Sequence, residues 1–169
     1  MFPAQFRLLK RKLNTNRKVY RSFLTKAEKK SPPGVDELTP VLEPQVWEEV
    51  NCLSCANCCR TMTPTFTRQD ITRIAAHFGQ TPAQFKAQWL EQDKKNSDWV
   101  NKIQPCQFLN LKTNLCSIYE IRPVDCSGFP HLTKRKFHEY AHVHKQNIEY
   151  CPATLTMMQK LMDHYEGSR

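Results

Sequence analysis

Hydrophobic positions recur at helical spacing over the first thirty residues. The apolar side chains lie three or four positions apart, as on one face of an α-helix, and lysines and arginines fill the positions between them. They are Phe2, Phe6, Leu9, Leu13, Tyr20, Phe23 or Leu24, and Ala27. The Asn-Thr-Asn at residues 14–16 is a place where the helix could divide in two. The pattern predicts a basic amphipathic helical extension over residues 1–30.

The segment that follows breaks this periodicity. Residues 31–34 read Ser-Pro-Pro-Gly, and proline both lacks the backbone donor and restricts the residue before it. The sequence therefore predicts a linker over residues 31–44. A short helix around residues 44–50 then leads into one domain over residues 45–169.

Two helix starts are marked by capping residues in this domain. Thr67, with Asp70 three positions later, is typical of an N-cap followed by an acid in the first turn, and Gly79 is placed to end that helix. Thr81-Pro82 then opens a helix that is predicted to run to about residue 95, with proline at its preferred first position.

The remaining elements are predicted from shorter patterns. The segment between Cys106 and Cys116 indicates a short hairpin. Residues 140–144 are predicted to form a strand, and residues 152–165 a final amphipathic helix. The fold class is therefore mainly α, with short irregular β pieces and an N-terminal helical extension.

Eight cysteines change this picture. The chain shows no secretory signal and no run of about 18 apolar residues, so we expect a cytoplasmic protein, in which thiols stay reduced. Metal or redox chemistry is then favoured over disulfides, whereas four disulfides would be the simple interpretation of an exported chain. The domain is accordingly predicted to be a small, cysteine-rich metal-binding domain.

The first four cysteines form the pattern C-x2-C-x2-C-C at Cys52, Cys55, Cys58 and Cys59. Two-residue gaps let tight turns aim thiolates at one centre, as in ferredoxins. The spacing differs from the C-x3-C-x2-C of radical S-adenosylmethionine enzymes. Because neighbouring side chains diverge, Cys58 and Cys59 are expected to serve two metals, or one of them binds metal while the other packs or reacts.

A second set of four lies downstream, at Cys106, Cys116, Cys126 and Cys151. All eight cysteines are candidate metal ligands. Together they could build two four-thiolate sites, one [4Fe–4S] cluster with spare thiols, or a binuclear site. Thiolates suit Zn²⁺ and iron–sulfur clusters alike, so spacing leaves the cofactor open between them.

Several separated motifs agree in order with a known family. They are the C-x2-C-x2-C-C run, Asp70 at a helix start, Cys106-Gln107-Phe108-Leu109, Cys116-Ser117-Ile118-Tyr119, Arg122-Pro123-Val124-Asp125-Cys126, Phe129-Pro130, and the late Cys151. Over about residues 50–155 the chain resembles the YkgJ-type cysteine-cluster proteins, the zinc- or iron-chelating CxxCxxCC domain family.

The resemblance implies a small bacterial cytoplasmic metal-binding domain with the eight cysteines as ligands. A related cluster in flagellin lysine N-methylases points to an iron–sulfur centre. This sequence has Ala56-Asn57 where family members often have a glycine before the paired cysteines, and Asn57 is expected to tolerate the left-handed turn.

Three further features of the sequence each allow two interpretations. Arg122 could lie near the thiolates and neutralise them, or pair with a surface acid. His142 and His144, beside His138, would share one side of a strand and could add imidazole ligands, or be ordinary surface histidines. Asp70 could hydrogen-bond the cysteine loop, or act only in the first turn of its helix.

Charge is concentrated at the N-terminus. Residues 1–30 contain ten of the 25 lysines and arginines and a single acid, Glu28. Such a segment attracts nucleic acid, an anionic membrane surface or an acidic protein partner. Alternatively, it packs its apolar stripe on the domain and keeps its charges in water.

These features exclude some classes of function but do not select one. The four glycines form no phosphate-binding loop, which excludes nucleotide binding by that device, and no nucleophile–base pair can be identified. The leading hypothesis is a metal-binding protein that holds an iron–sulfur cluster or zinc. The alternatives are an iron–sulfur-dependent enzyme or redox component, and a zinc-folded adaptor, so enzymatic activity stays open.

Overall fold

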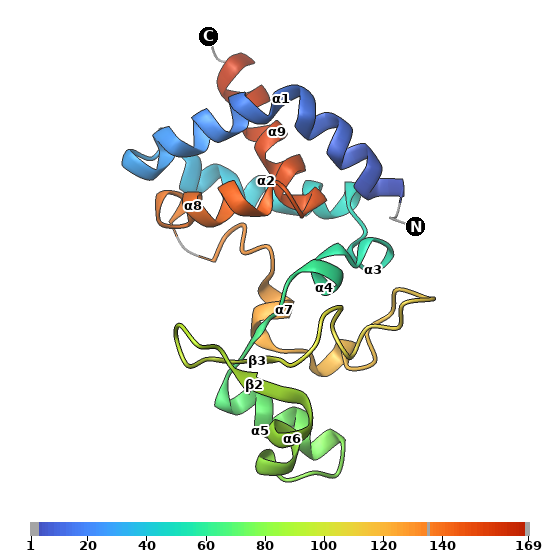
Figure 1. Ribbon diagram of the computed structural model, residues 1–169. Coiled ribbons are helices and arrows are strands. Elements are labelled where there is room, and N and C mark those ends of the chain that lie inside the picture. The colour runs from blue at the N-terminus through green and yellow to red at the C-terminus, as the bar shows by residue number, and fades with distance from the viewer. Residues whose placement is uncertain (1–3, 135, 168–169) are drawn as a thin grey trace. The chain divides into compact units, whose positions relative to one another are not determined.

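The computed structural model describes residues 4–134 and 136–167 (Figure 1). The predicted fold class is confirmed: the chain is mainly α, with a small three-stranded sheet. Contacts divide the chain into two compact units. The helical unit comprises the chain up to residue 55 together with the chain from residue 130 onward, and the sheet unit comprises residues 56–129.

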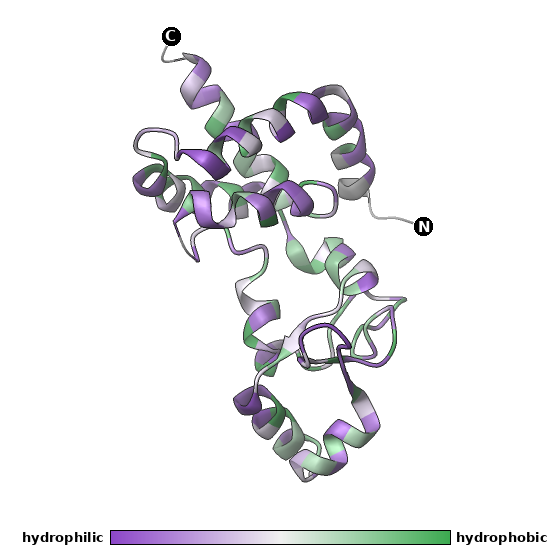
Figure 2. Cartoon of the chain, turned by 60° about the vertical axis from the view of Figure 1, so that its left-hand side comes forward, coloured by the Kyte–Doolittle hydropathy of each residue, from purple (hydrophilic) through white to green (hydrophobic). Residues whose placement is uncertain are grey.

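The helical unit contains the two ends of the chain. Its helices are α1 (Ala4–Lys29), α2 (Val35–Glu49), α3 (Cys52–Cys55), α8 (Phe137–Asn147) and α9 (Pro152–Gly167). α1 packs against α8 and α9, and α2 packs against α9. Fully buried side chains from all four long helices form the core, among them Leu13, Leu24, Val46, Phe137, Met158 and Leu161. Figure 2 shows hydrophilic and hydrophobic residues interleaved along these helices.

The amphipathic N-terminal helix is confirmed. Leu13, Tyr20, Leu24 and Ala27 are buried, and α1 runs through residues 14–16 without a break. Phe2 lies outside the described residues, as do the side chains of Phe6 and Leu9. The apolar stripe faces the other helices because burying it there removes it from water.

The predicted linker over residues 31–44 is wrong. Helix α2 begins at Val35, after Gly34 with φ of +69°, and includes Pro40 and Pro44. Val35, Thr39 and Val46 are buried at helical spacing. Packing of this face against α9 offsets the backbone hydrogen bonds that the two prolines cannot donate.

The strand predicted over residues 140–144 is also wrong, because these residues belong to α8. The buried residues of this segment recur at helical spacing: they are Phe137, Ala141, His144 and Ile148. Five residues are too few to distinguish this helical period from the alternating pattern of a strand. The final helix is confirmed as α9.

The sheet unit alternates short helices with short strands. Its elements are α4 (Asn57–Thr61), β1 (Thr65–Phe66), α5 (Arg68–His77), α6 (Pro82–Trp89), β2 (Leu90–Gln92), β3 (Trp99–Asn101), the 3₁₀ helix η1 (Tyr119–Ile121) and α7 (Val124–Gly128). The strand order is β1-β3-β2, with both pairings antiparallel, so that Val100 pairs with Thr65 on one side and with Glu91 on the other.

Both predicted capping signals are confirmed. Thr67 with Asp70, and Thr81 with Gln84, form reciprocal capping boxes at the starts of α5 and α6. α5 ends before Gly79, whose φ is +64°. α6 ends at Trp89 rather than near residue 95, because Leu90 leaves the helix and pairs with β3.

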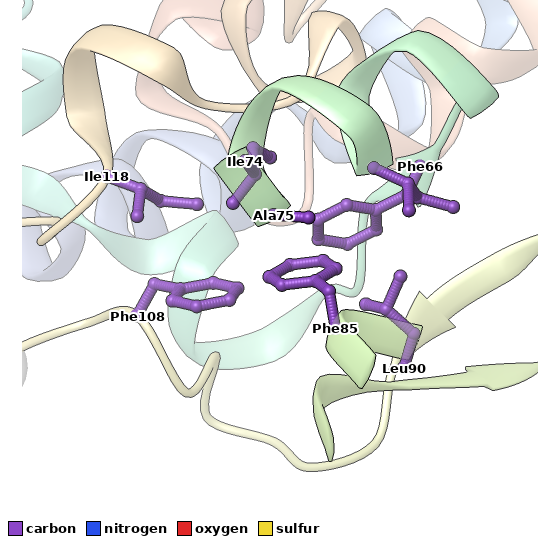
Figure 3. Close-up of a cluster of buried hydrophobic side chains, with 8 residues drawn as sticks. Phe66, Ile74, Ala75, Phe85, Leu90, Phe108 and Ile118 are labelled. Atoms are coloured by element: carbon purple, nitrogen blue, oxygen red, sulfur yellow. The ribbon is translucent and has the colours of Figure 1, made fainter. Parts of the chain in front are cut away.

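An aromatic core holds the sheet unit together. The Phe85 and Phe108 rings stack with centroids 6.3 Å apart, and Figure 3 shows them among Phe66, Ile74, Leu90 and Ile118. Cys106 and Cys116 pack against this cluster from the segment predicted to be a hairpin. There Leu109 and Cys116 form an isolated antiparallel bridge, and the Asn110 N–H donates to the Leu115 carbonyl at 2.8 Å.

Candidate metal centre

Five of the eight cysteines lie in the sheet unit, on four different segments. Cys58 and Cys59 belong to α4, Cys106 and Cys116 flank the hairpin turn, and Cys126 lies in α7. Cys59 is close enough to Cys106, Cys116 and Cys126 for its charge to raise the pKa of each of them. The fold therefore brings Cys106, Cys116 and Cys126 within electrostatic reach of Cys59, which is up to 67 positions away in sequence.

The sulfurs of Cys106 and Cys116 are each placed by a local turn. The Phe108 N–H donates to the Cys106 sulfur, and the Ile118 N–H donates to the Cys116 sulfur, two positions after the cysteine in both cases. Burial raises the pKa of both thiols, whereas these donors lower it. The two turns thus favour thiolate at the positions where a metal ligand would be needed. The Cys106 N–H also donates to the Cys59 carbonyl at 2.8 Å, which joins the hairpin to α4.

Cys126 is the most strongly perturbed of these thiols. Burial raises its pKa far above the ordinary value, and the charges of Cys59, Cys106, Asp125 and Cys116 raise it further. Without a positive charge nearby this thiol stays protonated at neutral pH. A metal cation reverses that balance, because its charge favours the thiolate that burial disfavours.

Asp70 ties α5 to the segment that carries Cys126. Its side chain is fully buried and accepts hydrogen bonds from the Thr67 N–H at 3.0 Å, the Arg73 guanidinium at 2.7 Å and the Val124 N–H at 3.2 Å. Burial alone would raise the pKa of Asp70, but these bonds outweigh it and lower the pKa. Asp70 therefore acts in the first turn of its helix, as one interpretation has it, and also holds the start of the segment that carries Cys126.

Two further contacts hold the Cys126 segment, and sequence reasoning missed both. Arg73 donates to the Arg122 carbonyl at 3.0 Å, and the Thr65 N–H donates to the Asp125 carboxylate at 3.1 Å. The position of Arg73 one turn after Asp70 is a signal for their ion pair, but nothing local indicates the contact of Arg73 with Arg122, 49 positions away. Nothing local indicates the second, since 60 positions separate its partners.

Arg122 lies within electrostatic reach of the gathered thiols. Its guanidinium stacks on the Tyr119 ring at 3.9 Å and donates to the Tyr119 carbonyl at 2.5 Å. Its positive charge lowers the pKa of Cys116, although burial of that thiol is the larger effect and raises it. Of the two interpretations of Arg122, the effect of its charge on Cys116 favours a cation near the thiols.

The adjacent Cys58 and Cys59 do not diverge as expected. Their sulfur atoms are 3.9 Å apart. Sulfurs at about 2.3 Å from a tetrahedral zinc ion are separated by about 3.8 Å. One ion could therefore take both cysteines, and the expectation that strain keeps them apart is wrong.

The other three cysteines belong to the helical unit. Cys52 is exposed on α3, Cys55 is buried at the end of α3, and Cys151 is buried directly before α9. Burial raises the pKa of Cys151 to about 11. The N–H groups of Thr154 and Ala153, in the first turn of α9, donate to its sulfur and lower the pKa, but burial is the larger effect. The charge of Cys52 raises the Cys151 pKa slightly further, so these two thiols interact. The C-x2-C-x2-C-C run thus supplies Cys52 and Cys55 to one unit and Cys58 and Cys59 to the other.

The turn inside this run departs from expectation. Ala56, not Asn57, adopts the left-handed conformation, with φ of +46° and ψ of +19°. Asn57 starts α4 and is buried. A side chain with Cβ is strained in this region, which is why glycine is the ordinary residue there.

The histidines considered as additional ligands belong to the helical unit. His142 and His144 are on helix α8 in the helical unit, not on a strand. His144 is buried and contacts the Phe137 and Tyr140 rings, and among the described residues neither of its ring nitrogens has a hydrogen-bond partner. His138 is exposed and shares a 3.1 Å hydrogen bond with Ser31. The described contacts thus give His144 an apolar, structural setting.

All eight cysteines are thiols, and none forms a disulfide. Among the residues that the structure describes, no three histidine, cysteine, aspartate or glutamate side chains are arranged so that they could hold a metal ion. The chemistry of the donors nevertheless fits zinc or iron: four thiols gathered from separate segments, two of them with N–H donors aimed at sulfur and one with an arginine nearby.

This fold and these thiols define a small, mainly α cysteine-cluster protein. The chain belongs to the family described as "CxxCxxCC: Putative zinc- or iron-chelating domain", whose model matches residues 51–152. Comparison with curated proteins and with solved structures gives no match. Within the described residues, each helix is too short or too polar to cross a membrane.

Proposed function

We propose that this protein binds zinc or iron through its cysteines, with the principal centre formed in the sheet unit by Cys59, Cys106, Cys116 and Cys126. The observation that carries the proposal is that Cys59 lies within electrostatic reach of Cys106, Cys116 and Cys126 and raises the pKa of each of them. Thiols that repel one another on ionisation are brought together by the fold, and a cation removes that repulsion.

Cys58 is the natural additional ligand of this centre, because its sulfur lies 3.9 Å from that of Cys59. In the helical unit, Cys52, Cys55 and Cys151 form a second group of candidate ligands, in which the charge of Cys52 raises the pKa of Cys151. Metal binding has to draw the sulfur atoms closer than they are. When bound, the metal would link segments of the sheet unit that otherwise meet mainly through the aromatic core and the Asp70 contacts.

The donor set suits both zinc and an iron–sulfur cluster, and purification under anaerobic conditions distinguishes them. A colourless protein with stoichiometric zinc identifies a structural zinc centre. A brown protein with iron and acid-labile sulfide identifies an iron–sulfur cluster.

The residue assignment is tested by single substitutions. Cys126→Ser should lose the metal of the sheet unit, while Cys151→Ser should leave that metal in place. Ser117→Ala is the matched control, because Ser117 is exposed and adjacent to Cys116. Metal is measured by elemental analysis and folding by far-ultraviolet circular dichroism. A folded Cys126→Ser protein with the full metal content would contradict the assignment.

A further inference from the structure

Helix α1 carries basic side chains on the side opposite its buried stripe. Its residues advance by about 100° each, so Arg11, Lys18 and Lys29, which are seven and eleven positions apart, project in nearly the same direction. All three are exposed. Leu13 and Tyr20 point the opposite way, into the core of the helical unit. The result is a straight row of positive charge about 27 Å long, at about 1.5 Å of rise per residue.

Further lysines widen this row. Lys12, Lys26 and Lys30 are exposed on one flank of it. We define the basic face as the six exposed residues Arg11, Lys12, Lys18, Lys26, Lys29 and Lys30. Among the ion pairs of the described residues, none involves a member of this set.

Two acidic residues, Glu149 and Glu28, form ion pairs at a different flank of α1. Arg17 and Arg21 pair with Glu149 at 3.0 and 3.8 Å, and Glu28 pairs with Lys145 of α8. These ion pairs fasten α1 to the rest of the helical unit. Glu149 and Glu28 are therefore used in holding the helix, and their ion pairs among the described residues do not include the basic face.

We infer that the basic face binds the phosphate backbone of a nucleic-acid duplex without reading its sequence. A rigid row of cations matches a regular polyanion, which carries about one charge per 1.7 Å of duplex axis. The row supplies phosphate contacts and nothing that would reach base edges.

The structure argues against two other polyanions. A membrane-surface helix buries its apolar side in lipid, but that side of α1 is packed inside the protein. Only Leu8 and Val19 are large exposed apolar residues on the described part of α1, and eleven positions separate them. A single-stranded nucleic acid would be bound by stacking of its bases on aromatic side chains. However, Tyr20 is buried, and Phe23 packs on Phe137 and Tyr165.

Binding to a fluorescein-labelled 20-base-pair duplex of arbitrary sequence, measured by fluorescence anisotropy over a range of salt concentrations, tests this inference. The triple variant Arg11→Gln, Lys18→Gln and Lys29→Gln removes the centre of the row. The matched control is Lys94→Gln, Lys95→Gln and Lys112→Gln, which removes the same charge from exposed positions of the sheet unit.

The full-length protein should bind with a Kd of about 1–100 μM, with affinity falling as salt rises. The α1 variant should bind at least about tenfold more weakly, and its salt dependence should be shallower by about two to three phosphate contacts. The control variant should stay within about twofold of the unmodified protein. Metal content and thermal unfolding of each variant show that neither folding nor the cysteine centre has changed.

Equal weakening by the two variants would overturn the inference, because it would show a response to net charge alone. Absence of duplex binding at low salt would also overturn it. Vesicles of phosphatidylcholine with phosphatidylglycerol are the remaining comparison. If the protein bound these vesicles more tightly than the duplex, and the α1 variant lost vesicle binding, the basic face would be assigned to a membrane instead.

Discussion

The buried carboxylate of Asp70 accepts a hydrogen bond from the backbone N–H of Val124, 54 positions later, at 3.2 Å. Val124 begins α7, the helix that carries Cys126. One carboxylate thus caps α5 and holds the start of the segment that contains a candidate ligand. The chain between them includes α6, the strands β2 and β3, and the hairpin, so this bond joins two distant parts of the sheet unit.

Substituting Asp70→Asn should destabilise the protein by about 1–3 kcal/mol, because an amide is a poorer partner for Arg73 and for the two N–H donors. The loss should depend on pH. The folded-state pKa of Asp70 is lowered, so its contribution is fully present above the unfolded pKa of about 3.9 and disappears as pH falls through the folded pKa. The unfolding free energies of the two proteins, measured in urea, should therefore converge in acid.

Asp98→Asn is the control for this substitution. Asp98 is exposed, and its replacement should change the unfolding free energy by less than about 0.5 kcal/mol. If Asp70→Asn were as mild as Asp98→Asn at neutral pH, Asp70 would not hold the Cys126 segment.

Arg122→Gln should weaken zinc binding most at the acidic end of the range from pH 6 to pH 8. The guanidinium lowers the pKa of Cys116, so its loss makes the thiolate harder to form and moves metal uptake to higher pH. Competition with a chromophoric chelator at several pH values measures the shift. Arg68→Gln, at an exposed position of α5, should leave the curve in place. Identical curves for Arg122→Gln and the unmodified protein would exclude an electrostatic role for Arg122.

His144→Phe should make the protein less sensitive to mild acid. Burial lowers the pKa of His144 to about 4, with smaller contributions from His131 and His142. Between about pH 6.5 and pH 4 the unfolded chain binds a proton that the folded chain does not. Stability therefore falls in this window, by up to about 3 kcal/mol for this group. Phenylalanine has no such proton and fits among the neighbouring aromatic rings.

The measurement is the difference in unfolding free energy between the two proteins at pH 7 and at pH 4.5, in which shared contributions such as metal release cancel. His142→Gln is the control, because His142 is exposed on the same helix. A pH-independent difference for His144→Phe would show that the histidine is solvated in solution.

Ala56→Gly should leave the unfolding free energy unchanged or raise it by up to about 1 kcal/mol. Glycine occupies the left-handed region without the cost that Cβ imposes, although it loses more backbone entropy on folding. The same substitution at Ala75, buried in helix α5, should cost about 1 kcal/mol or more. In thermal unfolding, no loss of stability for Ala56→Gly beside a clear loss for Ala75→Gly would confirm the backbone strain. Equal losses at the two positions would contradict it.

The sequence by itself determined the elements whose cause is local. Each of these elements depends on residues within a few positions of one another. They are the capping boxes at Thr67 and Thr81, the end of α5 at Gly79, the apolar stripe of α1, and helix α9. The family motif likewise lies in the order and spacing of residues, and its match over residues 51–152 confirms that resemblance.

The tertiary structure alone decided the rest, because distant side chains supply the energy. Packing on α9 makes a helix of a segment with two prolines, and pairing with β3 ends α6 at Trp89. Long-range contacts, such as that of Asp70 with Val124, divide the C-x2-C-x2-C-C run between two units. They also bring Cys59 within electrostatic reach of Cys106, Cys116 and Cys126. Spacing identifies which atoms can bind a metal. Only packing between segments far apart in the chain determines which of them meet.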